Sequence, residues 1–535
     1  MITRIPHYID LMNKYKGEKR EIIMTPSDCF QNFKNKIKPV DYYAFFSTFV
    51  IGLFAHMRIF LQDIPNHDGV NSIFFDQNMI TSGRWFLRVA CGISTDYTLP
   101  WLIGVLVIFY ISVAAVVLVR FFNIEHRFSA VLIGGLFASY PVLASNFAYI
   151  FTADGYMLAL LLAVLSVYFT SKYKRGFIVG GICLGFSMGI YQAYLSFAMI
   201  LSLYAVCRIL LHEKTWKDKV QNAVRYLYMG VLGGGIYFVM LQILLFIQQT
   251  ELSGYQGIGS TNTLSLVDKI ILMYRDFIVH SLAGNILTQN IFHIVMLGIL
   301  MLGAFVGIFC TMKQKGKFKD YTVYIGFVGA ILMLPTCFNI VLFISPQVQY
   351  HSLMRMQWVL IPISMIAIID QTVRFKNKTF NACVQWGTIV GAVILIWGYI
   401  EIDNIAYFNL EKKYDKTYTY ITRLLDRMEE TPGYEHGMEV AMIGVVGDDY
   451  LPSTDMTVGV TDNLLGVNGD YLFYTAENYR NFIKYYFGVE IELIDMDLMT
   501  EITQSEEYHS LNTFPKQKSM KVVDGVLYIK LENEN

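Results

Sequence analysis

Charged residues are scarce in this chain of 535 residues, and their scarcity excludes several classes of protein. Asp, Glu, Lys and Arg make up 16% of the sequence, whereas hydrophobic residues make up 54%. The formal net charge is -1, so the composition indicates neither a nucleic-acid partner nor an acidic one. The sequence also lacks a glycine-rich phosphate loop, a metalloprotease helix and a nucleophile elbow, which argues against ATP-driven transport and serine hydrolysis.

Cysteine is equally sparse, and its distribution excludes a disulfide framework. Of the seven cysteines, six lie in the N-terminal tail or in predicted spans, and only Cys91 lies in an outer loop. No Cys and His spacing typical of a zinc site is present, so no metal or other cofactor is expected. The polar residues before the first apolar run contain no short apolar region followed by a cleavage site, so we expect no removable signal peptide.

Apolar runs of about 20 residues, the length that crosses a hydrocarbon core as a helix, are abundant instead. A lipid-exposed backbone must satisfy its own hydrogen bonds, and no barrel-type alternation is visible. We therefore predict an α-helical polytopic membrane protein with about eleven transmembrane helices. The expected spans are residues 41–60, 99–120, 129–147, 155–171, 177–192, 194–211, 226–248, 289–311, 321–344, 353–371 and 380–402.

The loops between these spans sort by charge. Lys and Arg accumulate on the cytoplasmic side of membrane proteins, so the basic set of loops is expected to face the cytoplasm, as is the N-terminal segment 1–40. An odd number of spans then places the C-terminus outside. The basic loops contain Arg120, Arg127, Lys172, Lys174, Arg175, Lys214, Lys217, Lys219, Arg225, Lys313, Lys315, Lys317, Lys319, Arg374, Lys376 and Lys378, and the alternate loops hold only Arg84, Arg88, Lys269, Arg275 and Arg355.

The composition changes after the transmembrane domain of residues 41–402. Residues 403–535 are polar and contain no run long enough to cross a bilayer, so we predict a separate extracytoplasmic domain with a small α/β fold. Apolar residues recur at helical spacing between Tyr414 and Met428, residues 440–443 are typical of a buried strand, and residues 522–529 are typical of a hairpin.

Three other segments outside the spans are informative. Residues 61–98 contain Trp85, Phe86 and Leu87, which favours a helix along the membrane surface. Residues 250–288 begin with Gly254, Gly257 and Gly259 and continue with helical periodicity, which is typical of a second interfacial helix or of a mobile lid. In the C-terminal domain, Asp448-Asp449 resembles acidic pairs that hold a metal in nucleotide-sugar enzymes, although a pair that ends a strand explains it too.

Two carboxylates are candidates for chemistry on the outer side. Asp68 closely follows the first span, and a carboxylate held near the lipid boundary can have its pKa raised enough to act as a general base. Asp154 begins the fourth span on the same side, so the two could share one cavity. The alternatives are a solvated loop residue for Asp68 and a helix N-cap for Asp154.

Aromatic and polar residues accompany these carboxylates. Tyr191 and Gln192 lie at the next outer turn, where they could hold a sugar ring, although a belt of interfacial tyrosines explains Tyr191 equally well. Tyr156, His67 and Trp85 complete the set that we predict to bind substrate.

Arginine on the outer side indicates a bound phosphate. Arg355 lies just before the tenth span, where the positive-inside rule disfavours it, and a guanidinium can grip a phosphate through two hydrogen bonds. Arg84 and Arg88 offer the same chemistry on the first outer loop. The alternative for all of them is snorkelling to lipid headgroups. His56 and Arg58 are candidates of lower rank.

The order of these motifs along the chain resembles the type C glycosyltransferase superfamily and, within it, the bacterial glucosyl transferase II family of O-antigen-modifying, serotype-converting membrane enzymes. The resemblance covers the membrane region to about residue 400 and implies an essential acidic residue on the first outer loop and a lipid-phosphate sugar donor. It is carried by Asn66-His67-Asp68-Gly69, Gly83-Arg84-Trp85, Asp154-Gly155-Tyr156 and Tyr191-Gln192.

The resemblance implies transfer of a sugar, expected to be glucose, from a polyprenyl-phosphate donor to a hydroxyl of a cell-surface polysaccharide outside the membrane. Asp68 would remove the hydroxyl proton as C1 is inverted, Arg355 and Arg84 would stabilise the departing lipid phosphate, and Asp154 would orient sugar hydroxyls. Because a phosphate monoester is a good leaving group, no metal is required.

Two other functions stay open. A transporter or flippase for a lipid-linked sugar would use the same arginines and aromatic rings but would not need an outer base. An O-acyl or phosphoryl transferase acting on the same polymer is the second possibility, and an acyltransferase would want an activated histidine such as His67, His280 or His351.

Overall fold

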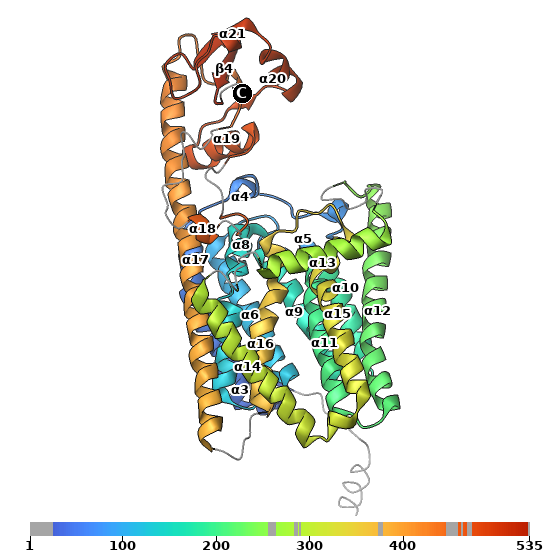
Figure 1. Cartoon of the computed structure of the whole chain (residues 1–535). Helices are drawn as coiled ribbons and strands as arrows, with labels where there is room; N and C mark the ends of the chain where they lie inside the picture. Colours follow the sequence, from blue (N-terminus) through green and yellow to red (C-terminus); the bar gives the residue numbers. More distant parts are fainter. Residues whose placement is uncertain are drawn as a thin grey trace, which may run out of the picture.

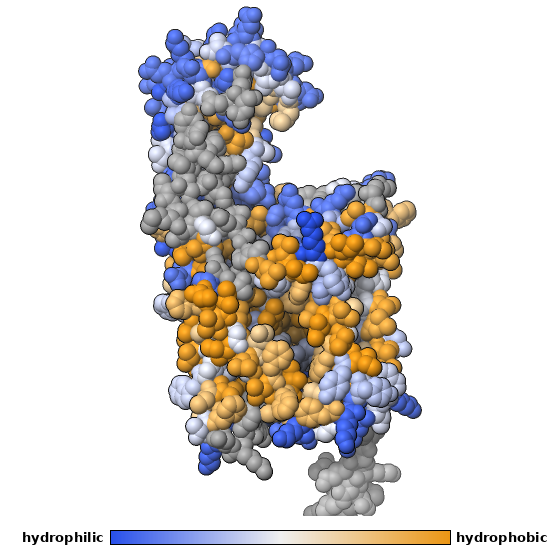
Figure 2. Space-filling view, viewed as in Figure 1, coloured by the Kyte–Doolittle hydropathy of each residue, from blue (hydrophilic) through white to orange (hydrophobic). Residues whose placement is uncertain are grey.

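The protein is a bundle of long helices with a smaller domain beyond one end (Figure 1). The computed structural model describes residues 25–254, 264–282, 287, 290–372, 378–445, 458–461, 464–467 and 473–532. On the face that Figure 2 shows, apolar side chains form a band across the bundle, and most of the coloured side chains of the smaller domain are polar. This distribution is the one expected for a membrane region joined to a water-exposed domain.

Eight helices of the described chain are long and apolar enough to cross a membrane, and a ninth candidate is a helix pair bent by 45°. The chain is therefore a multi-pass membrane protein by helix composition. The eight are α3 (Pro39–Leu61), α6 (Pro100–Phe122), α9 (Ile150–Lys172), η3 with α11 (Gln192–His212), α12 (Trp216–Gln248), α14 (Ile291–Gln314), α15 (Tyr321–Ile344) and α17 (Lys378–Glu429), and the bent pair is α7 (Arg127–Ala138) with α8 (Val142–Ala148).

The two remaining expected spans, 177–192 and 353–371, fall on shorter apolar helices. These are α10 (Gly176–Ile190) and η7 with α16 (Met356–Val359 and Leu360–Thr372). Helix α10 packs closely on α12 because it presents glycine there: a Cβ at Gly185 would lie 2.8 Å from the Ile236 side chain. Every expected span thus coincides with a helix or a bent pair, and eight or nine of them qualify as spans by length and composition.

Helix α17 runs for 52 residues without interruption and joins the membrane region to the C-terminal domain (Figure 1). Its first half is the last expected span. Its second half buries Tyr420, Leu424 and Met428 in the apolar cluster of the C-terminal domain, so the predicted helical periodicity is confirmed. The helix continues through Asp403, where the sequence changes from apolar to polar.

A four-stranded mixed sheet in the order β2-β1-β4-β3 forms the C-terminal domain together with short helices. Strand β1 (Glu439–Ile443) pairs in parallel with β2 (Glu492–Leu493) and β4 (Val526–Lys530), and β4 pairs antiparallel with β3 (Met520–Val523). The turn Asp524-Gly525 has positive φ at both residues, as a tight two-residue hairpin requires. The predicted strand, hairpin and small mixed fold are confirmed, whereas Asp448-Asp449 lies outside the described residues.

The C-terminal domain rests on the loop between α3 and α6, which contains Asp68. Val70, in the short helix α4 (His67–Asn71), is fully buried in the domain's own apolar cluster. Helix α19 (Ala476–Phe482) and the π-helix η8 (Ile483–Phe487) supply the polar contacts. Three side-chain hydrogen bonds join the two parts: Asn478 Nδ2 to His67 O at 3.0 Å, Asn481 Nδ2 to Asn71 Oδ1 at 2.8 Å, and Tyr486 OH to Asp63 Oδ2 at 2.8 Å.

The prediction of a helix along the membrane surface around Trp85 is wrong. Helix α5 spans only Leu87–Cys91, and Trp85 is buried, with its ring 5.4 Å from that of Phe186. Gly189 of α10 makes room for the Trp85 ring, since a Cβ there would lie 2.4 Å from it. A large ring removes more apolar surface from water inside the bundle than at the membrane surface, so packing overrides the interfacial preference.

The helix predicted in the second outer segment is confirmed. Helix α13 (Leu266–Leu282) lies across the ends of neighbouring helices rather than along them (Figure 1). Asn339 in α15 donates a hydrogen bond to the carbonyl of Met273 at 2.9 Å, which fastens α13 to the bundle. Gly257 and Gly259 lie outside the described residues.

The burial of Val70 gives a first prediction. Val70→Asp places an unpaired carboxylate in the C-terminal apolar cluster, at a cost of at least about 3 kcal/mol, and should detach the domain from the loop. Hydrogen exchange should rise in both α4 and α19. Val89→Asp, on a side chain that is 66% exposed, is the matched control. Unchanged protection of α19 in Val70→Asp would contradict the docking.

Candidate functional site

Asp68 lies in α4, a single helical turn that begins after the N-cap residue Asn66. The Asn66 side chain accepts a hydrogen bond from the Gly69 N–H at 2.7 Å, as a short polar N-cap residue does. The Asp68 side chain is 54% exposed. The carboxylate is thus open to solvent, in contrast to the low-dielectric surroundings expected from the sequence, and a substrate can reach it.

His67 stands beside this carboxylate. Its Nε2 lies 3.6 Å from Asp68 Oδ1, and its ring packs edge-on against Tyr474 of the C-terminal domain at 4.5 Å between centroids. Burial lowers the pKa of His67; the Asp68 charge opposes this shift and Lys413 adds to it. His67 is therefore a neutral imidazole at neutral pH, able both to donate and to accept a hydrogen bond.

Asp154 lies in the first turns of α9 and is fully buried. Its Oδ1 accepts hydrogen bonds from Ser94 Oγ at 2.5 Å and from the Gly155 N–H at 2.9 Å. Because α9 begins at Ile150, the N-cap explanation is wrong. Within the described chain Oδ2 has no hydrogen-bond partner, and a buried acceptor of this kind is one that a substrate hydroxyl can satisfy.

Arg84 is the centre of an aromatic cluster. Its Nη1 donates to the Tyr156 hydroxyl at 3.1 Å, and its guanidinium lies 4.8 Å from the centroid of the Tyr191 ring. The Tyr156 and Tyr191 rings stack on each other at 4.4 Å and 12°. Three predicted site residues from three distant segments therefore meet, and they combine a cation with the aromatic faces that suit an anionic sugar ligand.

Gln192 and Trp85 support the loop that carries Arg84. Gln192 Nε2 donates to the Tyr237 hydroxyl of α12 at 3.0 Å and lies 3.4 Å from the carbonyl of Ser82. Trp85 is buried against Phe186. Both side chains hold the loop that carries Arg84 against α10 and α12.

Helix α9 connects the Asp68 loop to the Arg84 cluster. The Tyr149 ring, at the N-cap of α9, lies 6.3 Å from that of His67. Asp154 and Tyr156 follow Tyr149 by five and seven residues, which corresponds to about 7.5 and 10 Å along the axis. The Asp68 loop and the Arg84 cluster thus lie along the first turns of one helix.

Arg355 is buried and paired with a carboxylate that sequence reasoning missed. Its Nη1 and Nη2 donate to the two oxygens of Asp276 at 2.8 and 2.9 Å, and Nη2 also donates to the carbonyl of Tyr350 at 3.2 Å. A bidentate pair of this kind satisfies a guanidinium well. Arg355 therefore fastens α13 to the loop before α16, and a phosphate would have to displace Asp276 to bind it.

The two histidines near this pair are uncharged. Burial, reinforced by Arg355, lowers the pKa of His280 to about 3 and also lowers that of His351. His280 packs edge-on against Trp358 at 4.7 Å between ring centroids. His280 lies one helical turn after Asp276 in α13, and His351 lies in the loop just before Arg355.

The remaining candidates make contacts of other kinds. Arg88 forms an exposed ion pair with Asp76 at 3.0 Å. His56 is buried between the Tyr407 hydroxyl at 2.6 Å and the Ala138 carbonyl at 2.8 Å, and Arg58 pairs with Glu411. The contacts of His56 and Arg58 join α3 to α17, so these two side chains hold the bundle together.

Residues 464–467 of the C-terminal region fit between the outer loops. Leu464 and Val467 are buried in the apolar core of the membrane region. The Leu465 N–H donates to Ser352 Oγ at 3.0 Å. Gly466 has a φ of 88°, and a Cβ there would lie 2.8 Å from Tyr149 and 3.2 Å from Asn66 Nδ2. This short segment thus contacts the Asp68 loop, the start of α9 and the loop of Arg355.

Sequence reasoning missed Asp276, Lys413, Tyr474 and Asn478. Asp276 and His280 share one face of α13 at a spacing of four residues, which was the only available signal. The other three reach the Asp68 loop from more than 300 residues away in the sequence, and no local pattern marks them.

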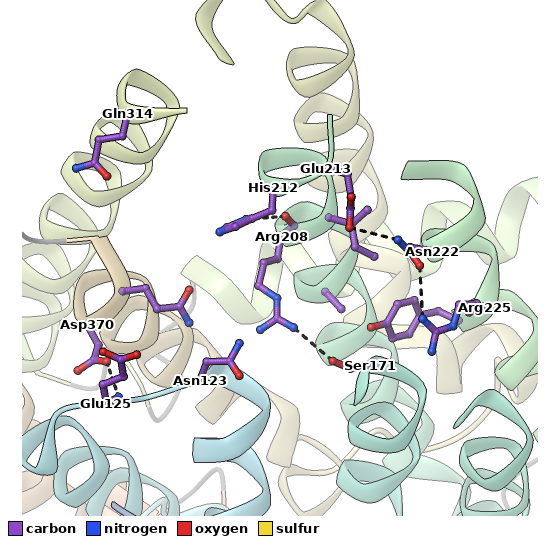
Figure 3. Close-up of a pocket in the computed structure, with 14 residues that line it drawn as sticks. Asn123, Glu125, Ser171, Arg208, His212, Glu213, Asn222, Arg225, Gln314 and Asp370 are labelled. Carbon is purple, nitrogen blue, oxygen red and sulfur yellow. Dashed lines mark hydrogen bonds between the residues drawn. The ribbon is translucent and has the colours of Figure 1, made fainter. Parts of the chain in front are cut away.

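A polar cavity of about 710 Å³ lies at the opposite end of the bundle, among the basic loops (Figure 3). Several of its polar groups bond to one another or to the backbone: Arg208 donates to Phe121 O at 2.8 Å and to Ser171 Oγ at 3.3 Å, and Asn222 donates to Glu213 at 3.3 Å. Among its described lining residues are none of those predicted to act in catalysis.

The Arg355 pair generates a second prediction. Asp276→Asn removes the negative charge from the pair and should lower the stability of the protein in detergent by about 2 kcal/mol. Thermal unfolding measures this loss, and Asp268→Asn, at the exposed start of α13, should have a smaller effect. A stability in Asp276→Asn equal to that of Asp268→Asn would show that the pair does not hold α13.

Comparison with known proteins assigns the membrane region to a family. The family model described as glucosyl transferase GtrII matches residues 57–365, which is more than half of the chain. The match contains α4, the Arg84 cluster and Arg355, and it ends before α17. No curated protein and no solved structure matches this chain. The chain therefore belongs to the glucosyl transferase GtrII family and is a multi-span membrane glucosyltransferase of that family.

Proposed function

We propose that this glucosyltransferase moves glucose from a polyprenyl-phosphate donor to a hydroxyl of a cell-surface polysaccharide, on the extracytoplasmic face of the bacterial cytoplasmic membrane. The proposal includes eleven spans in a type C arrangement, with the N-terminus in the cytoplasm. The proposal is supported by the different composition of the two ends of the helix bundle. The Lys- and Arg-rich loops lie at one end, and the candidate site and the C-terminal domain lie at the opposite end (Figure 1).

The single observation that carries the mechanism is the position of Asp68. It is an accessible carboxylate on a helical turn that is fixed on both sides, by Asn66 at its start and by the C-terminal domain at its end. The neutral imidazole of His67 lies beside it and can orient an acceptor hydroxyl.

The proposed reaction is a single displacement. The acceptor oxygen forms a bond to C1 of the glucose as the bond between C1 and the phosphate oxygen breaks, and the configuration at C1 inverts. The hydroxyl proton passes to the Asp68 carboxylate, which acts as the general base. The electron pair of the broken bond leaves with the polyprenyl phosphate.

Arg84 is proposed to bind the leaving phosphate. Its guanidinium lies between the Tyr156 hydroxyl and the face of the Tyr191 ring, beside the first turns of α9. A phosphate there would form charge-assisted hydrogen bonds with the guanidinium, and the aromatic faces suit the sugar attached to it. Oδ2 of Asp154, which has no hydrogen-bond partner among the described residues, would accept a glucose hydroxyl.

An apolar groove of about 530 Å³ suits the lipid chain. It is lined by α11, α14, α15 and α16, from Arg208 and Gln371 at one end to Phe338 and Leu360 at the other. Phe338 packs against Trp358 at 4.6 Å between ring centroids, next to the loop of Arg355. The groove thus runs from the basic end of the bundle to the neighbourhood of Arg355.

The test is sugar transfer by the purified protein, with polyprenyl-phosphate glucose and the cell-wall polysaccharide of the host. Asp68→Asn should lower kcat by about 10²- to 10⁴-fold, the contribution of a general base, while donor binding stays unchanged. Asp76→Asn, an exposed carboxylate on the same loop, is the control and should stay active.

Two outcomes would redirect the assignment. Full activity in a well-expressed Asp68→Asn protein would exclude Asp68 as the base. Absence of transfer by the wild type, combined with movement of the glycolipid across a vesicle membrane, would favour the flippase alternative.

A further inference from the structure

We propose that Asn478 of the C-terminal domain is a positioning residue for the catalytic loop, so that the domain outside the family match is part of the catalytic apparatus. This inference rests on the proposed role of Asp68. Asn478 acts through the main chain of His67, to which its side chain donates a hydrogen bond.

The Asp68 loop cannot hold its own conformation. Helix α4 has five residues, and one helical turn is unstable in isolation because nucleation fixes several residues for a single hydrogen bond. Its orientation must therefore come from tertiary contacts. Val70 at the centre of the turn is fully buried by the C-terminal domain, so much of that support comes from there.

Asn478 makes the contact nearest to Asp68 in the sequence. Its side chain is 3% exposed, and Nδ2 donates to the His67 carbonyl at 3.0 Å. That carbonyl belongs to the peptide group between His67 and Asp68. The hydrogen bond therefore fixes the plane of this peptide group, next to which the Asp68 side chain is attached. The acceptor is a main-chain atom, which cannot rotate to find another donor without moving the loop.

The oxygen of the Asn478 side-chain amide is also held by hydrogen bonds. Its Oδ1 accepts hydrogen bonds from the N–H groups of Tyr474 and Thr475 at 2.9 and 3.2 Å, within the capping box of α19. The ring of Tyr474 packs against that of His67. The amide therefore joins the start of α19 directly to the peptide before Asp68.

This arrangement allows two complementary substitutions. Asn478→Asp keeps a carboxylate oxygen to accept from Tyr474 and Thr475, loses the donor to His67 O and adds a negative charge. Asn478→Ala adds no charge but loses both the donor to His67 O and the acceptor for Tyr474 and Thr475. Asn512→Asp is the matched control, because Asn512 also donates to a main-chain carbonyl, that of Gln517 at 2.7 Å, in an exposed turn remote from α4.

The experiment measures transfer kinetics of the full-length protein with polyprenyl-phosphate glucose. Both Asn478 variants should lose at least about 10-fold in kcat with the donor KM within about twofold of the wild type, since misplacing a catalytic group by about 1 Å can cost about 100-fold. Asn512→Asp should match the wild type in both constants. In an Asp68→Asn background, Asn478→Asp should cause no further loss, because it acts through Asp68.

Three results would overturn the inference while leaving the proposed function intact, provided that Asp68→Asn shows its expected loss in kcat. They are an unchanged kcat in Asn478→Ala, a loss confined to KM, and a loss that multiplies with that of Asp68→Asn. Full activity in Asp68→Asn alone would instead remove the proposed function, and this inference with it.

Discussion

The unbroken course of helix α17 is the constraint on which the arrangement of the Asp68 loop and the C-terminal domain depends. The helix packs in the membrane region over its first half and in the apolar cluster of the C-terminal domain over its second, so the domain cannot be placed independently of the bundle. Its position brings α19 onto the Asp68 loop and residues 464–467 between the loops of Asn66 and Ser352. A flexible linker after the last span would have fixed none of these contacts.

The candidate site contains both exposed and buried groups. Asp68 is accessible and borders a neutral histidine, whereas Asp154 is enclosed, with one oxygen held by Ser94. Arg84 lies against two stacked tyrosines, and Arg355 is neutralised by Asp276. The proposed reaction takes a proton at one point and releases a phosphate at another, and the separation of an exposed carboxylate from a cation in aromatic surroundings suits it.

The sequence predicted the helices well because the bilayer dictates their length and composition. Every expected span fell on a helix, and the hairpin at Asp524-Gly525 and the strand at 439–443 formed where turn chemistry and apolar runs placed them. Trp85 was misplaced because an interfacial ring and a buried ring look alike in sequence. The partners of the site residues could not be predicted: Asp276 binds Arg355 across 79 positions, and Asn478 reaches His67 across 411. Such pairings are decided by tertiary packing.

The most direct measurement is a structure of the protein with a non-transferable phosphonate analogue of polyprenyl-phosphate glucose. The account predicts the phosphonate at Arg84, the glucose C1 open toward Asp68, and the lipid chain in the groove that ends at Phe338. A head group bound in the polar cavity around Arg208 at the opposite end, with the Asp68 loop far from the sugar, would contradict it.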